Sequence, residues 1–316
     1  MKTILVPLDG STLAEQVLPW VRALAPVLDA NVQLLHVVSE NDRYHLMADN
    51  QGIDETGGVP VAPMRYANSW EPLRRNAQNY LEYQASLLAS AGIAVEIDVR
   101  LGQPDEIIVE AAENAKVAMI AMATHGYSGL KRWTLGSVTD KVIHATSTPV
   151  FVIRGGDTPV EPLAFQRILV PLDGSELARR ALPLAAELAT RTGAEMLLLS
   201  VATPPIMVAP EMITSVPLYD VTLEARQTQL RLELDKLADR LTREQLRVTR
   251  LVSPGTAAET IVDTAKERNV DLIVMATHGL SGIRRWALGS VADKVLHATT
   301  TPLLLVRASY ALSAQG

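Results

Sequence analysis

The chain carries one stretch twice, first as Met122-Ala-Thr-His-Gly-Tyr-Ser-Gly-Leu-Lys-Arg-Trp-Thr-Leu-Gly-Ser-Val-Thr-Asp-Lys141 and again as Met275-Ala-Thr-His-Gly-Leu-Ser-Gly-Ile-Arg-Arg-Trp-Ala-Leu-Gly-Ser-Val-Ala-Asp-Lys294. In each copy an apolar strand ends in Thr-His-Gly, and a Gly-Ser pair then opens a short helix. Unpaired backbone N–H groups and the positive end of the helix dipole meet at such a start, and phosphate binds there readily. The repeat therefore predicts a duplicated domain with two candidate anion sites.

The repeat extends well beyond this stretch. The opening Ile4-Leu-Val-Pro-Leu-Asp-Gly-Ser11 returns as Ile168-Leu-Val-Pro-Leu-Asp-Gly-Ser175, and His144-Ala-Thr-Ser-Thr-Pro149 returns as His297-Ala-Thr-Thr-Thr-Pro302. Two copies make a tandem pair, because a solenoid needs at least three. Between them lies a Gly- and Pro-rich segment of the kind that interrupts regular structure. We therefore expect a first domain over 1–154, a linker over 155–166, a second domain over 167–308 and a tail over 309–316.

Composition excludes several functional classes. The 316 residues carry a formal net charge of −6 and no long basic tract, which argues against a nucleic-acid footprint. The chain has no cysteine, so disulfides, thiolate catalysis and cysteine-ligated zinc are absent. No apolar run reaches membrane-spanning length, and the run that ends at Pro7 is too short for a signal-peptide core. These features predict a cytoplasmic location.

Strand and helix patterns alternate along each copy. In the first copy we expect strands at 3–8, 31–38, 93–101, 117–123 and 150–153, and helices at 11–28, 70–90, 103–115 and 137–145. Ser11 is the expected N-cap of the first helix. The second copy follows the same order from Arg167 to Arg307. Because parallel neighbours need crossover connections, the alternation predicts an α/β fold, in which a parallel sheet carries helices on both faces.

In open sheets of this kind, ligands bind beyond the carboxyl ends of the strands, where the strand order reverses. If the first and fourth strands flank that point, Pro7-Leu-Asp9 and Thr124-His-Gly126 converge on one crevice, and the second copy forms a matching one. The segments 39–69 and 202–220 follow the second strand of each copy. Lids over the crevice and solvent-facing connectors are both open interpretations of them.

These residues resemble the universal stress protein family. The resemblance rests on the Val-Pro-Leu-Asp-Gly-Ser openings, the nine residues that separate Gly126 from Gly136 and Gly279 from Gly289, and the Thr-Pro endings. It covers nearly the whole chain twice. The resemblance implies two tandem flavodoxin-like (adenine nucleotide alpha hydrolase-like) domains, each with a five-stranded parallel sheet. It also implies ATP in the crevice, as in the nucleotide-binding branch of the family, or else ADP or AMP, with or without Mg²⁺.

Carried over by position, the family pattern implies a set of nucleotide-binding residues in each copy. In the first copy these are Pro7, Leu8, Asp9, Val38, Met122, Ala123, His125, Gly126, Gly136, Ser137, Val138 and Thr139. In the second copy they are Pro171, Leu172, Asp173, Val201, Met275, Ala276, His278, Gly279, Gly289, Ser290, Val291 and Ala292. One departure is plain, since Ala123 and Ala276 occupy the place of the pattern's first glycine. The added methyl restricts backbone approach to a ligand and disfavours positive φ.

Structural alternatives accompany three of these motifs. Ser137-Val-Thr-Asp140 and its counterpart at 290–293 also match a capping box, in which the serine is the N-cap. Asp9 and Asp173 suit a ribose, an adenine amine or a nucleotide-bound Mg²⁺, and capping of the following turn is the alternative. For His125 and His278 we expect a backbone contribution, because no local cluster gives them a metal or general-base partner.

The functional prediction is a tandem universal stress protein that binds an adenine nucleotide and acts as a stress-response or signalling module. No general base or arginine clamp is visible for a γ-phosphate, so we assign no catalytic residue and expect slow hydrolysis at most. The alternatives are a scaffold protein whose crevices bind no nucleotide and an adenylate-processing enzyme. The resemblance also suggests an intrachain pseudo-dimer, with the last strands, 150–154 and 303–307, at its contact. A protein partner and a homodimer of whole chains are left open.

Overall fold

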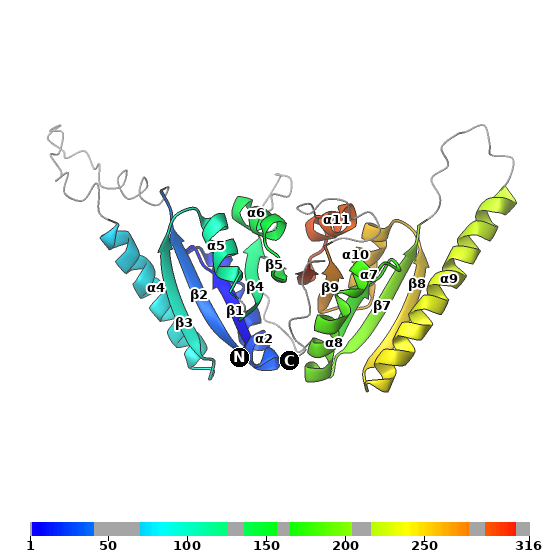
Figure 1. The fold of residues 1–316 in the computed structure, drawn as a ribbon, viewed down its shortest axis with the longest axis horizontal. Helices are drawn as coiled ribbons and strands as arrows, with labels where there is room; N and C mark the ends of the chain where they lie inside the picture. Colours follow the sequence, from blue (N-terminus) through cyan, green and yellow to red (C-terminus); the bar gives the residue numbers. More distant parts are fainter. Residues whose placement is uncertain are drawn as a thin grey trace.

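The computed structural model describes residues 2–40, 70–114, 116–124, 136–156, 165–203, 216–277 and 288–307, with side chains left out over 216–222. A ten-stranded sheet runs through both halves of this described part (Figure 1), in the order β3-β2-β1-β4-β5-β10-β9-β6-β7-β8. Within each half all strand pairs are parallel, and β5 and β10 join the halves as an antiparallel pair.

The first half follows the predicted order of elements. Its strands are β1 (Lys2–Pro7), β2 (Ala30–Val38), β3 (Val95–Leu101), β4 (Val117–Thr124) and β5 (Val150–Arg154). Its helices are α1 (Thr12–Glu15), α2 (Leu18–Leu28), α4 (Glu71–Ala89), α5 (Pro104–Ala112) and α6 (Ser137–Ala145). The strand order reverses between β1 and β4, as expected.

The second half repeats this arrangement. Its strands are β6 (Arg167–Pro171), β7 (Glu195–Ala202), β8 (Arg247–Pro254), β9 (Leu272–Ala276) and β10 (Leu303–Val306). Its helices are α7 (Glu176–Arg179), α8 (Leu182–Thr192), α9 (Val216–Arg243), α10 (Ala257–Glu267) and α11 (Ser290–Ala298). The reversal point lies between β6 and β9.

The prediction of one helix over 11–28 is wrong, because the segment forms two helices. Ser11 is the N-cap of α1, as expected, and its Oγ accepts from the Ala14 backbone N at 3.1 Å. The helix then breaks at Gln16 and Val17 before α2 begins. Pro19 lacks the N–H that would bond the Glu15 carbonyl of a continuous helix, and its ring would clash with that carbonyl.

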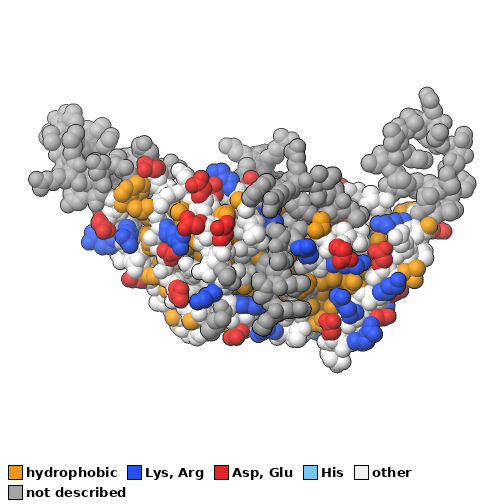
Figure 2. Space-filling view, in the orientation of Figure 1, with side chains coloured by type: hydrophobic (Ala, Val, Ile, Leu, Met, Phe, Trp, Pro, Cys, Tyr) orange, Lys and Arg blue, Asp and Glu red, His pale blue; other side chains and the backbone are white. Residues whose placement is uncertain are grey.

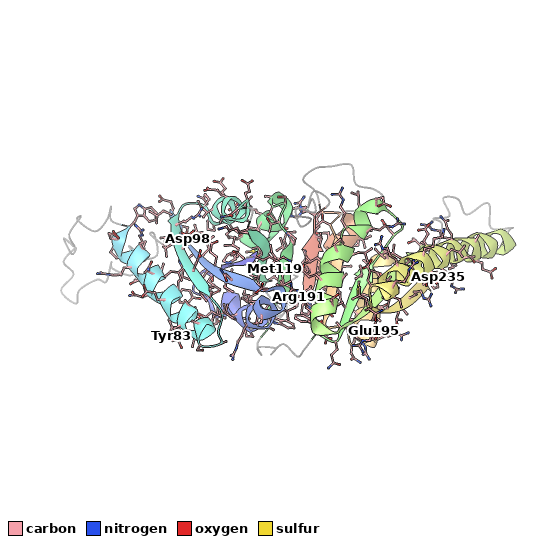
Figure 3. All side chains as sticks on the ribbon, turned by 60° about the horizontal axis from the view of Figure 1, so that its bottom comes forward. Tyr83, Asp98, Met119, Arg191, Glu195 and Asp235 are labelled. Atoms are coloured by element: carbon pink, nitrogen blue, oxygen red, sulfur yellow. The ribbon has the colours of Figure 1, made fainter. Side chains whose placement is uncertain are left out.

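Apolar side chains fill a layer on each face of the sheet. One layer packs α2, α4, α8 and α9 against the strands, with Leu24, Leu81, Leu188 and Leu234 all buried. The other layer packs α5, α6, α10 and α11. Figure 3 places Met119 inside the molecule and Tyr83 on the outer side of α4, where 60% of Tyr83 is exposed. The sheet therefore lies between two helical layers, as the predicted α/β fold requires.

The two halves share one core where they meet. The pairing of β5 with β10 sets Phe151 opposite Leu304. On α2, the ring of Trp20 lies 6.1 Å from those of both Phe151 and Phe165, so first- and second-half side chains pack together. The Nζ of Lys2 also reaches across to Glu187 on α8, at 2.5 Å from Oε1. The last strands thus form the contact between halves that the resemblance suggested.

The visible surface carries both signs of charge. Figure 2 shows acidic and basic side chains interspersed across this face, consistent with the mild net charge of −6. Among the described helices none is long and apolar enough to cross a membrane.

Candidate functional site

A cavity of about 300 Å³ opens at the carboxyl ends of β1 and β4 in the first half. Its walls come from the end of β1, the strand β2, the helices α1 and α5, and the start of α6. They comprise Pro7, Leu8, Asp9, Ser11, Leu13, Ala14, Leu35, Val37, Ser39, Pro104, Ile108, Met122, Ala123, Gly136, Ser137, Val138 and Thr139. The cavity lies at the strand-order reversal, where open α/β sheets hold their ligands.

The second half has a matching cavity of about 420 Å³ at the ends of β6 and β9. It is lined by Pro171, Leu172, Asp173, Ala178, Leu199, Val201, Thr203, Arg226, Ala257, Ile261, Met275, Ala276, Thr277, Gly289, Ser290, Val291 and Ala292. Both volumes fall within the range of about 300–1,000 Å³ that is usual for small-molecule sites.

Nearly all the predicted site residues that the structure describes line one of these cavities, and Val38 is the exception. Val38 is buried, whereas its neighbours Val37 and Ser39 line the first cavity. Alternate residues of a strand point to opposite faces, so only one of the two valines can face the ligand side. Leu35 pairs with Pro7 as Leu199 pairs with Pro171, which makes Val37 the counterpart of Val201. His125, Gly126, His278 and Gly279 lie outside the described residues.

The start of α6 differs from the capping-box interpretation. The N-cap is Gly136, at φ −56° and ψ 136°, and Ser137 is already the first helical residue. The first intrahelical bond runs from the Asp140 N to the Gly136 O at 2.9 Å. The N–H groups of Ser137, Val138 and Thr139 therefore have no acceptor within the helix. Because glycine offers no side-chain cap, these donors remain at the cavity wall.

The start of α11 has the same geometry. Gly289 is the N-cap, at φ −65° and ψ 146°, without a side-chain cap bond. Its O accepts from the Asp293 N at 2.9 Å, which leaves Ser290, Val291 and Ala292 without an acceptor inside the helix. The capping box is therefore wrong for both copies, and each cavity is bordered by a first turn of backbone donors.

Asp9 and Asp173 make the turn contacts that the alternative interpretation expected. Asp9 Oδ1 accepts from the Ser11 N at 2.9 Å, and Asp173 Oδ1 accepts from the Ser175 N at 2.9 Å. The residue after each aspartate is a glycine with positive φ, +83° at Gly10, which a side chain rarely adopts. Both aspartates also line their cavities, so the turn fixes each carboxylate at the cavity wall.

Ala123 and Ala276 lie within β4 and β9, in ordinary strand backbone. Neither is among the described residues with positive φ. The methyl groups that replace the pattern's glycine therefore cause no backbone strain. Both alanines line their cavities, so each methyl takes up a small part of the ligand space.

The sequence did not point to several lining residues. Leu35 and Val37 lie on one face of β2, and their alternation was a usable signal. Arg226 comes from α9, in the middle segment where the two copies do not align, and no local pattern marked it. It adds a cation to the second cavity, whereas Asp9 is the only charged side chain in the described lining of the first.

One titratable group that interacts electrostatically with the lining residue Asp9 is strongly perturbed. Burial, together with the nearby negative charges of Glu15 and Asp9, raises the pKa of the Tyr80 hydroxyl well above its ordinary value. In the described part of the chain, no group of three or more His, Asp or Glu side chains is arranged to hold a metal ion by itself.

The fold defines a tandem of flavodoxin-like α/β domains, each with a cavity at its strand-order reversal. Comparison with known proteins agrees with that class. The model of the Universal stress protein family matches residues 1–154 and 164–307, and the chain belongs to this family.

Individual relatives match over the whole length. A universal stress protein of Mycolicibacterium smegmatis is 26% identical over 314 residues, covering 96% of each chain. One from Mycobacterium tuberculosis is 25% identical over 317 residues, covering 97% of each. The crystal structure of a universal stress protein from Archaeoglobus fulgidus superposes with a TM-score of 0.71 at 23% identity, covering 97% of this chain and 98% of that one. The similarity to the Archaeoglobus fulgidus structure shows a shared fold.

Proposed function

We propose that this protein binds ATP, or another adenine nucleotide, in both cavities and acts as a nucleotide-dependent stress-response or signalling module. The observation that carries the proposal is the start of α6 and α11, where a glycine N-cap leaves three backbone donors at a cavity wall. Such donors, with the positive end of the helix dipole, favour phosphate.

The remaining walls suit the rest of a nucleotide. In the first cavity, Leu35, Val37 and Ile108 offer apolar surface for a base, and the Asp9 carboxylate can accept from a ribose hydroxyl or an adenine amine. The same carboxylate, as an oxygen ligand, suits a Mg²⁺ ion carried in by the nucleotide. In the second cavity Asp173 has this role, and Arg226 adds a donor for an anionic group.

Hydrolysis is expected to be slow at most. Phosphoryl transfer depends on a positioned nucleophile and on cations around the γ-phosphate. The described lining has no histidine or lysine, and Arg226 in the second cavity is its one cation. We therefore expect a nucleotide that remains bound and stabilises the fold by mass action.

A melting experiment with Mg-ATP tests the proposal. Nucleotide at 100 times its Kd should stabilise the protein by about 2.7 kcal/mol for each occupied cavity, which raises Tm by several degrees. Replacing Gly136 and Gly289 together by Leu should abolish the rise, because the side chains fill the approach to the first-turn donors. The φ of each glycine is negative, so leucine fits the backbone. Ala89→Leu, exposed at the far end of α4, is the matched control and should keep the full rise.

The competing function is a scaffold whose cavities bind no nucleotide, and the methyl groups of Ala123 and Ala276 are the observation in its favour. Mass spectrometry of ligand released from protein purified without added nucleotide separates the two. If the purified protein carries no nucleotide and Mg-ATP does not change its melting curve, the scaffold function is supported and the proposal is ruled out. Multiple-turnover release of ADP or AMP would instead indicate an adenylate enzyme.

A further inference from the structure

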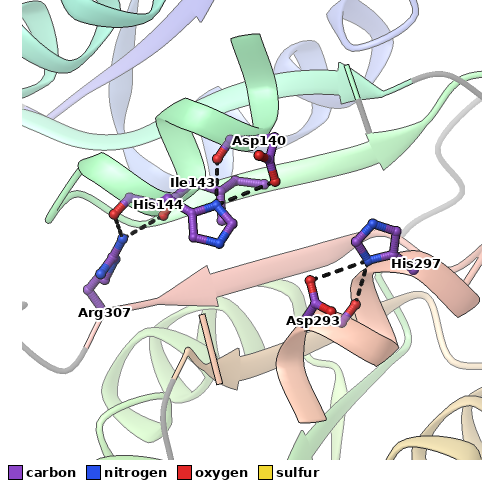
Figure 4. A network of polar contacts seen from close by, with 6 residues as sticks. All are labelled: Asp140, Ile143, His144, Asp293, His297 and Arg307. Carbon is purple, nitrogen blue, oxygen red and sulfur yellow. Dashed lines mark hydrogen bonds and ion pairs between the residues drawn. The ribbon is translucent and has the colours of Figure 1, made fainter. Parts of the chain in front are cut away.

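An arginine from the second half caps the C-terminal end of α6 in the first half (Figure 4). Arg307 directly follows β10, and its Nη2 donates to the Ile143 O at 2.7 Å and also to the His144 O. Both carbonyls belong to the last turn of α6, where a helix leaves its final carbonyls without internal donors. Arg307 is only 6% exposed as a whole residue, so these bonds form away from competing water.

The contact is reciprocated across the pseudo-dimer. Arg154, at the end of β5, donates from Nη1 to the Thr299 O at 3.3 Å and from Nη2 to the His297 O at 3.4 Å. These carbonyls terminate α11 in the second half. Each half therefore supplies the cation that caps the last helix of the other, and the longer distances make the Arg154 contact the weaker of the two.

The capped helices are the ones that begin at the cavities. Each has nine residues, α6 from Ser137 and α11 from Ser290. At about 1.5 Å per residue the capped end lies about 13 Å from the first-turn donors. At this distance the guanidinium cannot hydrogen-bond a bound phosphate directly. Its main effect is to fix the position of the helix.

The backbone beside each arginine is tied to the floor of its own half's cavity. The Thr277 N donates to the Val306 O at 2.9 Å, and the Gly289 N donates to the Thr277 O at 2.7 Å. In the first half, Arg154 pairs with Thr124, next to the lining residue Ala123. The backbone of each arginine is thus fixed beside the cavity of its own half, while its guanidinium caps the helix of the other half.

We propose that Arg154 and Arg307 are positioning residues that act crosswise, each setting the phosphate-binding helix of the opposite half. The inference rests on the proposed nucleotide function. It assigns Arg307 to the first cavity and Arg154 to the second, although neither lines either cavity. A misplaced helix misaligns all three donors. Removing either arginine should therefore lower nucleotide affinity in the other half.

The test uses full-length proteins in which one site is blocked. Gly289→Leu leaves the first cavity open and Gly136→Leu leaves the second, and ATP affinity is measured calorimetrically in each background. Arg307→Met should weaken ATP at the first cavity about five- to tenfold, at the lower end of typical coupling between sites, and leave the second within twofold. Arg154→Met should weaken ATP at the second cavity, by a smaller factor, and leave the first within twofold. Arg307→Lys, which keeps the charge without the planar fork, should recover part of the loss.

Arg191→Met is the control, because Arg191 is a partly exposed arginine on α8 that contacts Glu187 and neither capped helix. It should change neither affinity. The crosswise role would be overturned if Arg307→Met lowered ATP affinity equally at both cavities, or at the second cavity alone. Either result would indicate a general structural role for the arginine. If Arg307→Met does not fold, Arg307→Lys and the Arg154 variants decide by the same crossed pattern. Absence of ATP binding in the unmutated protein would instead refute the proposed function, and the inference with it.

Discussion

Tyr80 gives the first half a pH dependence that can be measured. Its hydroxyl pKa is raised by burial and by the charges of Glu15 and Asp9, whereas an unfolded chain loses this proton near pH 10. The neutral hydroxyl therefore contributes stability that is complete below about pH 10 and is lost as pH rises from there towards the raised value. We expect Tyr80→Phe to lose less stability than the unmutated protein between pH 7 and pH 10.5, measured by urea unfolding.

Tyr83→Phe is the control for this titration. Tyr83 lies one turn further along α4 with 60% of its surface exposed, so its variant should follow the unmutated protein at both pH values. A difference between Tyr80→Phe and the unmutated protein that stays constant from pH 7 to pH 10.5 would contradict the prediction.

Single residues also show where the sequence was informative. Pro7, Asp9 and Gly136 sit in motifs that recur in the second half, and such recurrence can be read without any structure. Val38 does not line the first cavity, whereas its neighbour Val37 does. The offset of 164 residues between Ile4 and Ile168 already pairs Val37 with Val201, and the register with β1 agrees.

At the scale of the element, α11 illustrates a conflict between helix stability and ligand binding. Serine is a much better N-cap than alanine and slightly better than glycine, and the φ of −65° and ψ of 146° at Gly289 suit it. Gly289→Ser should therefore stabilise the ligand-free protein by a few tenths of a kcal/mol while weakening ATP in the second cavity, since its Oγ would occupy a first-turn N–H. Urea unfolding and an ATP titration measure the two effects.

Gly289→Ala separates the cap from the added bulk. Alanine adds a methyl but no acceptor, so it should destabilise α11 slightly and weaken ATP less than serine does. Equal weakening by both variants would mean that bulk, and not competition for the donors, controls binding.

Pro19 explains the error in the helix prediction over 11–28. An amphipathic pattern over 11–28 fits one helix, but Pro19 divides it because the Glu15 carbonyl has no donor four residues later. Apolar periodicity is set by the core, and it continues across a break that preserves the same buried face. The proline was visible in the sequence and is the signal that decides the boundary.

At the scale of the whole molecule, duplication let the sequence predict the architecture but not the side-chain contacts between copies. Motif order gave two α/β units, and the resemblance placed the last strands together, as the pairing of β5 with β10 confirms. The bond from Arg307 to the Ile143 O joins residues 164 positions apart, and no local pattern marks such a partner. Arg226 went unnoticed for a related reason, because α9 lies where the two copies diverge.

The shared sheet predicts that the two halves stay together after the chain is cut between them. A specific protease site placed within 157–164 gives two fragments that remain joined by the β5–β10 pair, by Trp20 against Phe151 and Phe165, and by Lys2 against Glu187. We expect the cut protein to elute as one species in gel filtration and to keep its response to Mg-ATP.

The control for the cut protein is Phe151→Ala. Phe151 is fully buried, and its truncation in a core costs about 3–5 kcal/mol, here at the centre of the contact between halves. The cut Phe151→Ala protein should therefore separate into fragments at concentrations where the cut parent does not. Separate elution of the parent fragments would show that the covalent linker, and not the continuous sheet, holds the pseudo-dimer together. The crosswise arginine contacts would then depend on that linker as well, because they bridge the same boundary.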